Sequence, residues 1–420
     1  MKSLLPMSLL GLMLTLGAGV ASARKGYFPG PRNNAGVPKL AQREPFVLKG
    51  RPPCSWGRGY RNAIPGLVPG FIDTHATYWP YGFDMTDQNA SKTIRFSGQF
   101  PYARYMSLIA YNETGNTVAQ LFDYQIAPSL ASQNPYQPGI DRATPNRSYE
   151  VFLVREGSSR AGQPNTLVIP ARVKTVVVLL RVYLPDQGRS VDGGAGLPQI
   201  QAFDTVSGQP TTCPDYRYPL PAGTFRQVDV EPYTQGATIN SYRITGSEYQ
   251  PNGSNPYLAL ALRPSPSFVA VLQYRVPTTP QTSQGGGTFT SSHQVRYWSI
   301  CLGNAATSSV TSCLNDEEAF TSADGWLTVA IGAESLSRVA RARGLNFIPV
   351  RRWNGKPVLI FRQIMPSPNY AYPFSKVPPV DISNPTPEIS EQFRASRYIG
   401  DYAPQGRYCD IQSFLNGNCL

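Results

Sequence analysis

The chain alternates short apolar runs with turn-forming residues, which is the pattern of an all-β protein. Residues 93–100, 104–111 and 149–155 have the length and composition of strands, and loops rich in Asn, Gly and Pro separate them. The densest apolar run, residues 173–184, is rich in valine and predicts a buried strand. The 40 prolines interrupt long helices, so strands joined by many turns are expected.

An internal repeat is the most informative feature of this pattern. Residues 103–108 (ARYMSL) match residues 295–300 (VRYWSI), so both copies carry an R-Y-x-S strand. Three further segments recur in the same order: 94–101 with 271–277, 121–126 with 314–319, and 149–155 with 326–331. The sequence therefore predicts two related, jelly-roll-like β-sandwich modules with long loops and one or two short helices.

The repeat also divides the chain. The predicted parts are a signal peptide (1–23), an extended N-terminal arm (24–70), a first module (71–198), an irregular connecting segment (199–256), a second module (257–365) and a C-terminal tail (366–420).

The N-terminus has the layout of a secretory leader. Lys2 precedes a short apolar stretch, and Ala21 and Ala23 frame a small-residue cleavage site. The apolar stretch is short for a membrane span, so cleavage near Ala23 is favoured over an uncleaved anchor. The sequence predicts a secreted, periplasmic or cell-surface protein without a transmembrane anchor.

All six cysteines follow this leader, and an even number in an exported chain indicates disulfides. Six cysteines allow 15 connectivities, and the sequence alone does not choose among them. Two pairs are close in sequence and are expected to form, Cys301 with Cys313 and Cys409 with Cys419, which would leave Cys54 with Cys213. No C-x-x-C spacing occurs, so a zinc-thiolate site is disfavoured and no metal is expected.

Several of these segments carry a resemblance. ATYW at 76–79, FPYARYMS at 100–107 and VRYWSIC at 295–301 resemble a family of exported bacterial proteins of unknown function, often actinobacterial, with repeated R-Y-x-S strands. The resemblance implies a β-sandwich fold and export, and it implies no activity.

Charge suggests one class of partner. The net charge is +12, and the densest basic run extends from Arg338 to Lys356, including Arg351 and Arg352. It begins on a predicted helix, 334–343, that Gly344 closes. Cations are favourable at a helix C-terminus in any case, so a solvated helix end competes with a site for an anionic envelope polymer.

Aromatic residues suggest a second kind of surface. Tyr78, Trp79 and Tyr81 are close together at the start of the first module. Exposed aromatic rings bind sugars or protein surfaces, but the same residues also fill sandwich cores. They are therefore candidate binding residues with a structural alternative.

Catalytic signals are sparse. The two histidines are His75 and His293, and only His75 has a carboxylate close by in sequence, Asp73. There is no nucleophile elbow, metal-binding histidine motif or phosphate-binding loop. No nucleotide or other cofactor is expected.

The repeat pairs arginines with carboxylates. Arg104 with Asp123 and Arg296 with Asp316 have nearly the same separation in both copies. We expect surface ion pairs between neighbouring strands within each module, rather than a hydrolytic dyad. Taken together, the sequence favours an exported, non-catalytic binding or structural protein, associated with the envelope or secreted. The alternative is an extracellular hydrolase with a site near Asp73 and His75.

Overall fold

The computed structural model describes residues 53–61, 70–215, 238–244, 250–262, 267–285, 287–305, 307–350, 356–380 and 391–419, all within one compact unit. The predicted signal peptide, most of the predicted arm, Arg351 and Arg352 lie outside these residues.

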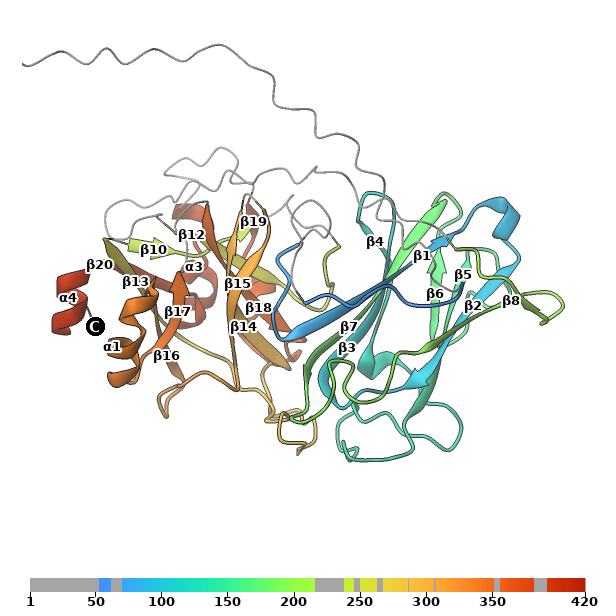
Figure 1. The fold of residues 1–420 in the computed structure, drawn as a ribbon, viewed down its shortest axis with the longest axis horizontal. Helices are drawn as coiled ribbons and strands as arrows, with labels where there is room; N and C mark the ends of the chain where they lie inside the picture. Colours follow the sequence, from blue (N-terminus) through green and yellow to red (C-terminus); the bar gives the residue numbers. More distant parts are fainter. Residues whose placement is uncertain are drawn as a thin grey trace, which may run out of the picture. The chain divides into compact units, whose positions relative to one another are not determined.

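The protein is mostly β, as predicted, and its first module consists of two sheets (Figure 1). In order across it, the first sheet holds β1 (Ala76–Asp84), β7 (Thr175–Pro185), β3 (Ala103–Tyr111) and β4 (Thr117–Phe122). The second holds β6 (Thr166–Ile169), β5 (Ser148–Arg155), β2 (Lys92–Gln99), β8 (Gln199–Asp204) and β9 (Pro210–Thr211). Two short 3-10 helices, η1 (Asp87–Asn89) and η2 (Asp123–Gln125), follow β1 and β4.

The second module also has two main sheets. The first holds β12 (Tyr257–Ala261), β18 (Pro357–Ile364), β14 (Tyr297–Asn304) and β15 (Val310–Asn315). The second holds β10 (Thr238–Asn240), β20 (Gln405–Asp410), β13 (Phe268–Arg275), β16 (Trp326–Ala333) and β17 (Asn346–Val350). A separate parallel pair joins β11 (Arg243–Ile244) to β19 (Pro379–Val380).

The two modules share one topology. The order β1-β7-β3-β4 corresponds strand by strand to β12-β18-β14-β15, and β8-β2-β5-β6 corresponds to β20-β13-β16-β17. Even the parallel pairing of β5 with β6 recurs between β16 and β17. The R-Y-x-S segments fall on β3 and β14, which are equivalent strands. The four segments found in the sequence are thus corresponding parts of one repeated fold.

Alternating side chains produce a separate core in each module. Met106 and Leu108 of β3 pack into the first core, whereas Trp298 and Ile300 of β14 pack into the second. The valine-rich β7 is buried on both faces for most of its length, which explains why its sequence does not alternate.

Two predicted boundaries are wrong. The connecting segment expected at 199–256 contributes β8, which pairs with β2 in the first module. The tail expected at 366–420 contributes β20, which lies between β10 and β13 in the second module. Both strands have polar residues on their outer faces, so short alternating runs resembled irregular chain.

The helices are short. Those described are α1 (Ser337–Ala342), α3 (Ser396–Ile399), α4 (Ile411–Asn416), η3 (Glu334–Leu336), η4 (Phe374–Lys376) and η5 (Gly400–Tyr402). Few and short helices agree with the prediction. Within the described chain, none of the helices has both the length and the hydropathy required to span a bilayer.

Both predicted local disulfides are present, Cys301–Cys313 and Cys409–Cys419, and the two remaining cysteines form Cys54–Cys213. The Cys54–Cys213 disulfide joins the described part of the N-terminal arm to the first module. The Cys409–Cys419 disulfide joins β20 to the chain that follows α4.

Substitution at Gly406 tests whether β20 is an integral strand. Gly406 lies opposite Leu272, and a Cβ added there would overlap the backbone of Val271. We expect Gly406→Ala to lower the free energy of unfolding by about 1–3 kcal/mol, because the strand must shift. Gly162→Ala is the control, since a Cβ at that position meets open space. Equal stabilities of the two variants in urea unfolding would contradict the central position of β20.

Candidate functional site

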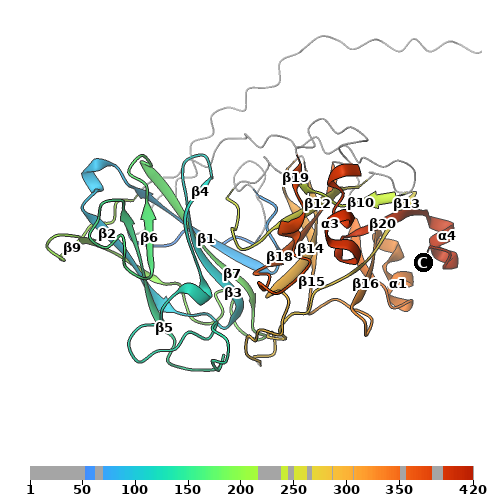
Figure 2. The same cartoon turned by 180° about the vertical axis from the view of Figure 1, so that it is seen from behind.

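The two R-Y-x-S strands meet at the joint between the modules, where β3 and β7 face β14 and β18 (Figure 1 and Figure 2). Tyr105 and Tyr297 are both fully buried, and each ring lies 5.6 Å from the ring of Tyr183. Both tyrosines point inward, as expected. They fill a cluster at the joint, however, and not the sandwich cores.

The arginines of the two strands exchange partners across this joint. Arg104 Nη1 donates to Asp316 Oδ2 at 2.6 Å, and Arg296 Nη1 donates to Asp123 Oδ1 at 2.7 Å. The predicted pairs Arg104–Asp123 and Arg296–Asp316 are therefore wrong in partner. They are also wrong in setting, because the pairs are buried rather than at the surface.

Contacts within the first module explain this exchange. Asp123 Oδ2 accepts a hydrogen bond from the backbone N–H of Met106 at 2.9 Å, so one carboxylate oxygen is held by the R-Y-x-S strand of its own module. The other oxygen faces the second module, where Arg296 reaches it. Each module presents an arginine and an aspartate at equivalent positions, and each arginine pairs with the aspartate of the other module; Arg104 also pairs with Glu317.

Tyrosine hydroxyls make a second exchange. Tyr297 donates to Asp73 Oδ2 at 2.9 Å, and Tyr105 donates to Asn252 Oδ1 at 3.1 Å. Asp73 and Asn252 are equivalent positions. Asp73 lies five residues before Tyr78, which is opposite the buried Arg181 on the neighbouring strand. Asn252 lies five residues before Tyr257, which is opposite the buried Arg362 in the same way. The joint thus has the reciprocal contacts of a self-complementary dimer interface within one chain.

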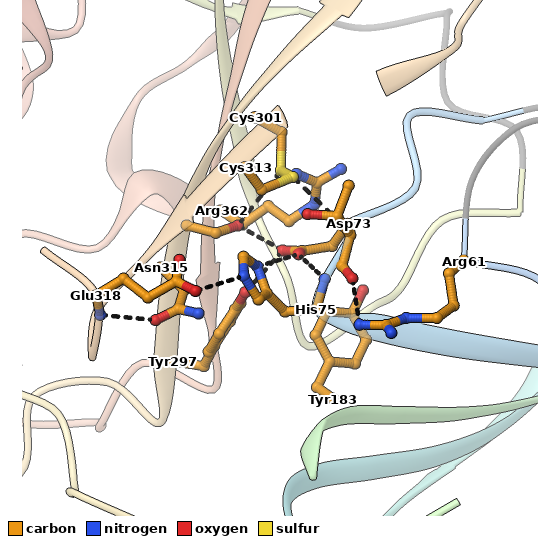
Figure 3. Close-up of polar contacts among 12 residues, drawn as sticks. Arg61, Asp73, His75, Tyr183, Tyr297, Cys301, Cys313, Asn315, Glu318 and Arg362 are labelled. Atoms are coloured by element: carbon orange, nitrogen blue, oxygen red, sulfur yellow. Dashed lines mark hydrogen bonds and ion pairs between the residues drawn. A yellow bond between two sulfur atoms is a disulfide. The ribbon is translucent and has the colours of Figure 1, made fainter. Parts of the chain in front are cut away.

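Asp73 is the centre of the most highly charged group at this joint (Figure 3). Its Oδ2 accepts hydrogen bonds from Ser299 Oγ at 2.6 Å and from Tyr297. Its Oδ1 lies 2.9 Å from the backbone nitrogen of His75 and 3.3 Å from His75 Nδ1. The other ring nitrogen of His75 lies 3.1 Å from Glu318 Oε1, so the imidazole bridges carboxylates of both modules.

The turn that carries Asp73 and His75 is anchored at Thr74. The Thr74 N–H points to the sulfur of Cys313, 3.4 Å away, and Arg61 donates to the Thr74 carbonyl at 2.6 Å. The Cys301–Cys313 disulfide therefore supports the turn from the second module.

The protonation states follow from burial and these contacts. Burial alone would raise the pKa of Asp73, but hydrogen bonding from His75 and the charge of Arg362 lower it well below 3.8. Burial alone would lower the pKa of His75, but Asp73 and Glu318 raise it to about 10. At neutral pH the group holds a carboxylate and an imidazolium.

This arrangement lacks the features of a hydrolytic site. The Ser299 hydroxyl donates to Asp73 and not to His75, so no base is placed to activate it. His75 is already protonated near pH 7 and therefore cannot accept a proton. The geometry uses these side chains to hold the modules together.

A metal is not favoured at the same place. Asp73, Cys301 and Cys313 are the one group in the described part of the chain whose donor atoms are close enough to hold an ion. The two sulfurs, however, are bonded to each other and so cannot act as thiolate ligands.

The three aromatic binding candidates take the structural alternative and fill the interior. Tyr78, Trp79 and Tyr81 of β1 are all buried. Tyr78 packs at the joint, while Trp79 and Tyr81 pack in the first core, because both faces of this sheet are covered. The polymer-binding candidates Arg351 and Arg352 lie outside the described residues.

Sequence reasoning missed three members of the Asp73 group: Tyr297, Ser299 and Arg362. The R-Y-x-S repeat marked the first two as recurring residues. No signal in a single sequence pointed to their contact with a turn more than 200 residues away, as the 226-residue separation of Ser299 and Asp73 illustrates.

Comparisons with known proteins add little. No family model matches the chain, and no curated protein matches it. It is similar to the crystal structure of an uncharacterized protein from Burkholderia cenocepacia, with 14% identity and a TM-score of 0.45 over 71% of this chain and 75% of that one. It is also similar to a protein from Vibrio parahaemolyticus, with 11% identity and a TM-score of 0.42 over 80% and 90%. Neither likeness bears on what the protein does.

A double-mutant cycle tests the exchanged ion pairs. Arg104→Met should lower the free energy of unfolding by about 3–5 kcal/mol, because it leaves the Asp316 carboxylate buried without its partner. Combining it with Asp316→Leu should recover part of that loss. Combining it with Asp123→Leu should give nearly additive losses. Strong coupling to Asp123 in place of Asp316 would contradict the exchange.

The His75 contacts predict a pH dependence. Because the folded-state pKa is raised to about 10, the stabilisation is fully present below about pH 6.5 and is lost as pH rises through 10. The stability gap between the wild type and His75→Gln should therefore shrink by about 2–4 kcal/mol between pH 6 and 10. Urea unfolding at each pH measures this difference in stability. The difference between the wild type and His293→Gln should not shrink in this way as the pH rises. A gap independent of pH would contradict a charged His75.

Proposed function

We propose that this is an exported, non-catalytic protein that binds an anionic polymer of the cell envelope. The observation that carries the proposal is a pair of exposed arginines on α1 that have no carboxylate partner among the described residues. The leader pattern of residues 1–23 supports export, and three disulfides are compatible with an oxidising compartment outside the cytoplasm.

The two arginines are Arg338 and Arg341, which are three residues apart and so share one helix face. Both are exposed, and neither forms an ion pair with any of the residues described. Arg343 differs from them, because it donates to the carbonyls of Phe414 and Leu415 and so ties α1 to α4. Two guanidinium groups are therefore available to a ligand.

Charge elsewhere in the sequence supports the same class of ligand. The chain carries +12 overall, and after β17 the sequence continues with Arg351 and Arg352, which lie outside the described residues. A polymer with repeated negative charges would gain from several weak contacts at once. A helix end that is only solvated would not bind such a polymer more strongly than other exposed arginines do.

The alternative, an extracellular hydrolase at Asp73 and His75, has less support. It requires a neutral histidine beside a nucleophile. The contacts of His75 with Asp73 and Glu318 favour its charged form.

Retention on immobilised dextran sulfate tests the proposal. The wild type should bind at low salt and elute as salt screens the charges. Arg338→Gln combined with Arg341→Gln should elute at clearly lower salt. The matched control, Arg58→Gln with Arg172→Gln, removes two exposed arginines elsewhere and should elute nearly as the wild type does. Equal shifts for both double variants would show that net charge alone is responsible and would contradict an α1 site.

A further inference from the structure

The joint holds two equivalent groups of buried polar side chains, which we call the first pocket, around Asp73, and the second pocket. In the second pocket Asn252 takes the place of Asp73, and Ser107 takes the place of Ser299. The strand register establishes the equivalence: Ser107 lies opposite Arg181 as Ser299 lies opposite Arg362.

The two arginines are placed in the same way. Arg362 donates to the carbonyl of Phe71, and Arg181 donates to the carbonyl of Gln250 at 2.8 Å. Each acceptor lies two residues before the position held by Asp73 or Asn252. Arg181 also lies over the ring of Tyr78, as Arg362 lies over the ring of Tyr257.

The pockets differ in charge. Arg362 has the carboxylate of Asp73 close by, whereas Arg181 has the neutral amide of Asn252 at the equivalent position. Arg181 is only 3% exposed, and the side chains around it are the tyrosines Tyr78, Tyr111, Tyr183 and Tyr257. Among the described residues, no carboxylate pairs with it. An uncompensated buried cation costs several kcal/mol, on the order of a broken ion pair.

The same pocket contains polar atoms with no partner among the described residues. They are Arg181 Nη1, the Ser107 hydroxyl and Asn252 Nδ2. Ser107 and Arg181 are opposite each other on adjacent strands and share a face with Tyr105, whose hydroxyl contacts Asn252. Buried polar atoms are rarely left unpaired in folded proteins.

We propose that this pocket binds a small monovalent anion such as chloride. The anion lies beside Asn252, whose amide holds the position of the Asp73 carboxylate, and it supplies the negative charge that this carboxylate supplies in the first pocket. Arg181 supplies the charge, and Ser107 and Asn252 supply the remaining donors. The buried setting favours a halide over a larger oxyanion, and one guanidinium favours a single negative charge.

Thermal unfolding tests the site with sodium chloride as the probe and sodium gluconate at equal ionic strength as the reference. For the wild type, chloride should raise the unfolding midpoint by a few degrees and then saturate, because it binds the folded state. Asn252→Asp supplies a carboxylate in place of the anion. It should abolish the chloride response and unfold in gluconate near the midpoint of the chloride-saturated wild type.

Asn116→Asp makes the same change of charge on an exposed turn, so it should retain the response. Crystals of the wild type soaked in bromide should show anomalous density between Arg181 and Ser107, a result that requires no variant to fold. The proposal is overturned if chloride has no effect beyond gluconate, if Asn252→Asp responds as the wild type does, or if the pocket contains no bromide.

Discussion

The structure depends on two buried arginine–aspartate pairs exchanged between the modules. Burying such pairs costs desolvation energy, so they add less to stability than their short distances suggest. They do restrict how the modules join, because a shifted docking would leave two arginines and two carboxylates buried without partners. We infer that the pairs determine the alignment of the joint and that the tyrosine cluster around Tyr183 contributes its apolar contact.

That alignment brings the turn at Asp73 against β14 and creates the charged group around His75. Its members resemble catalytic residues in kind but not in arrangement. The serine donates to the carboxylate, and the imidazole lies between two acids. The joint therefore explains why a histidine, a serine and an aspartate meet without forming a triad.

The repeat made the fold predictable, because four matched segments implied equivalent strands and the cysteine spacing suggested the two local disulfides. The partners in the ion pairs could not be predicted from the sequence. The separation of Arg104 from Asp123 is the same whether the arginine pairs within its own module or across the joint, so spacing could not distinguish the two. The sequence left two places open for Tyr78, Trp79 and Tyr81, a binding surface or the interior. They are buried because β1 is covered on both faces, and the cover of one face comes from the second module.

The approximate symmetry of the joint has a consequence for how the protein can change. In a dimer of identical subunits, any substitution at the interface appears twice, so both pockets would hold aspartate or both asparagine. A covalently fused pair is free of that constraint, and here one pocket holds an aspartate while the other holds an asparagine. Covalent linkage thus allows the two equivalent positions to carry different residues and different charges.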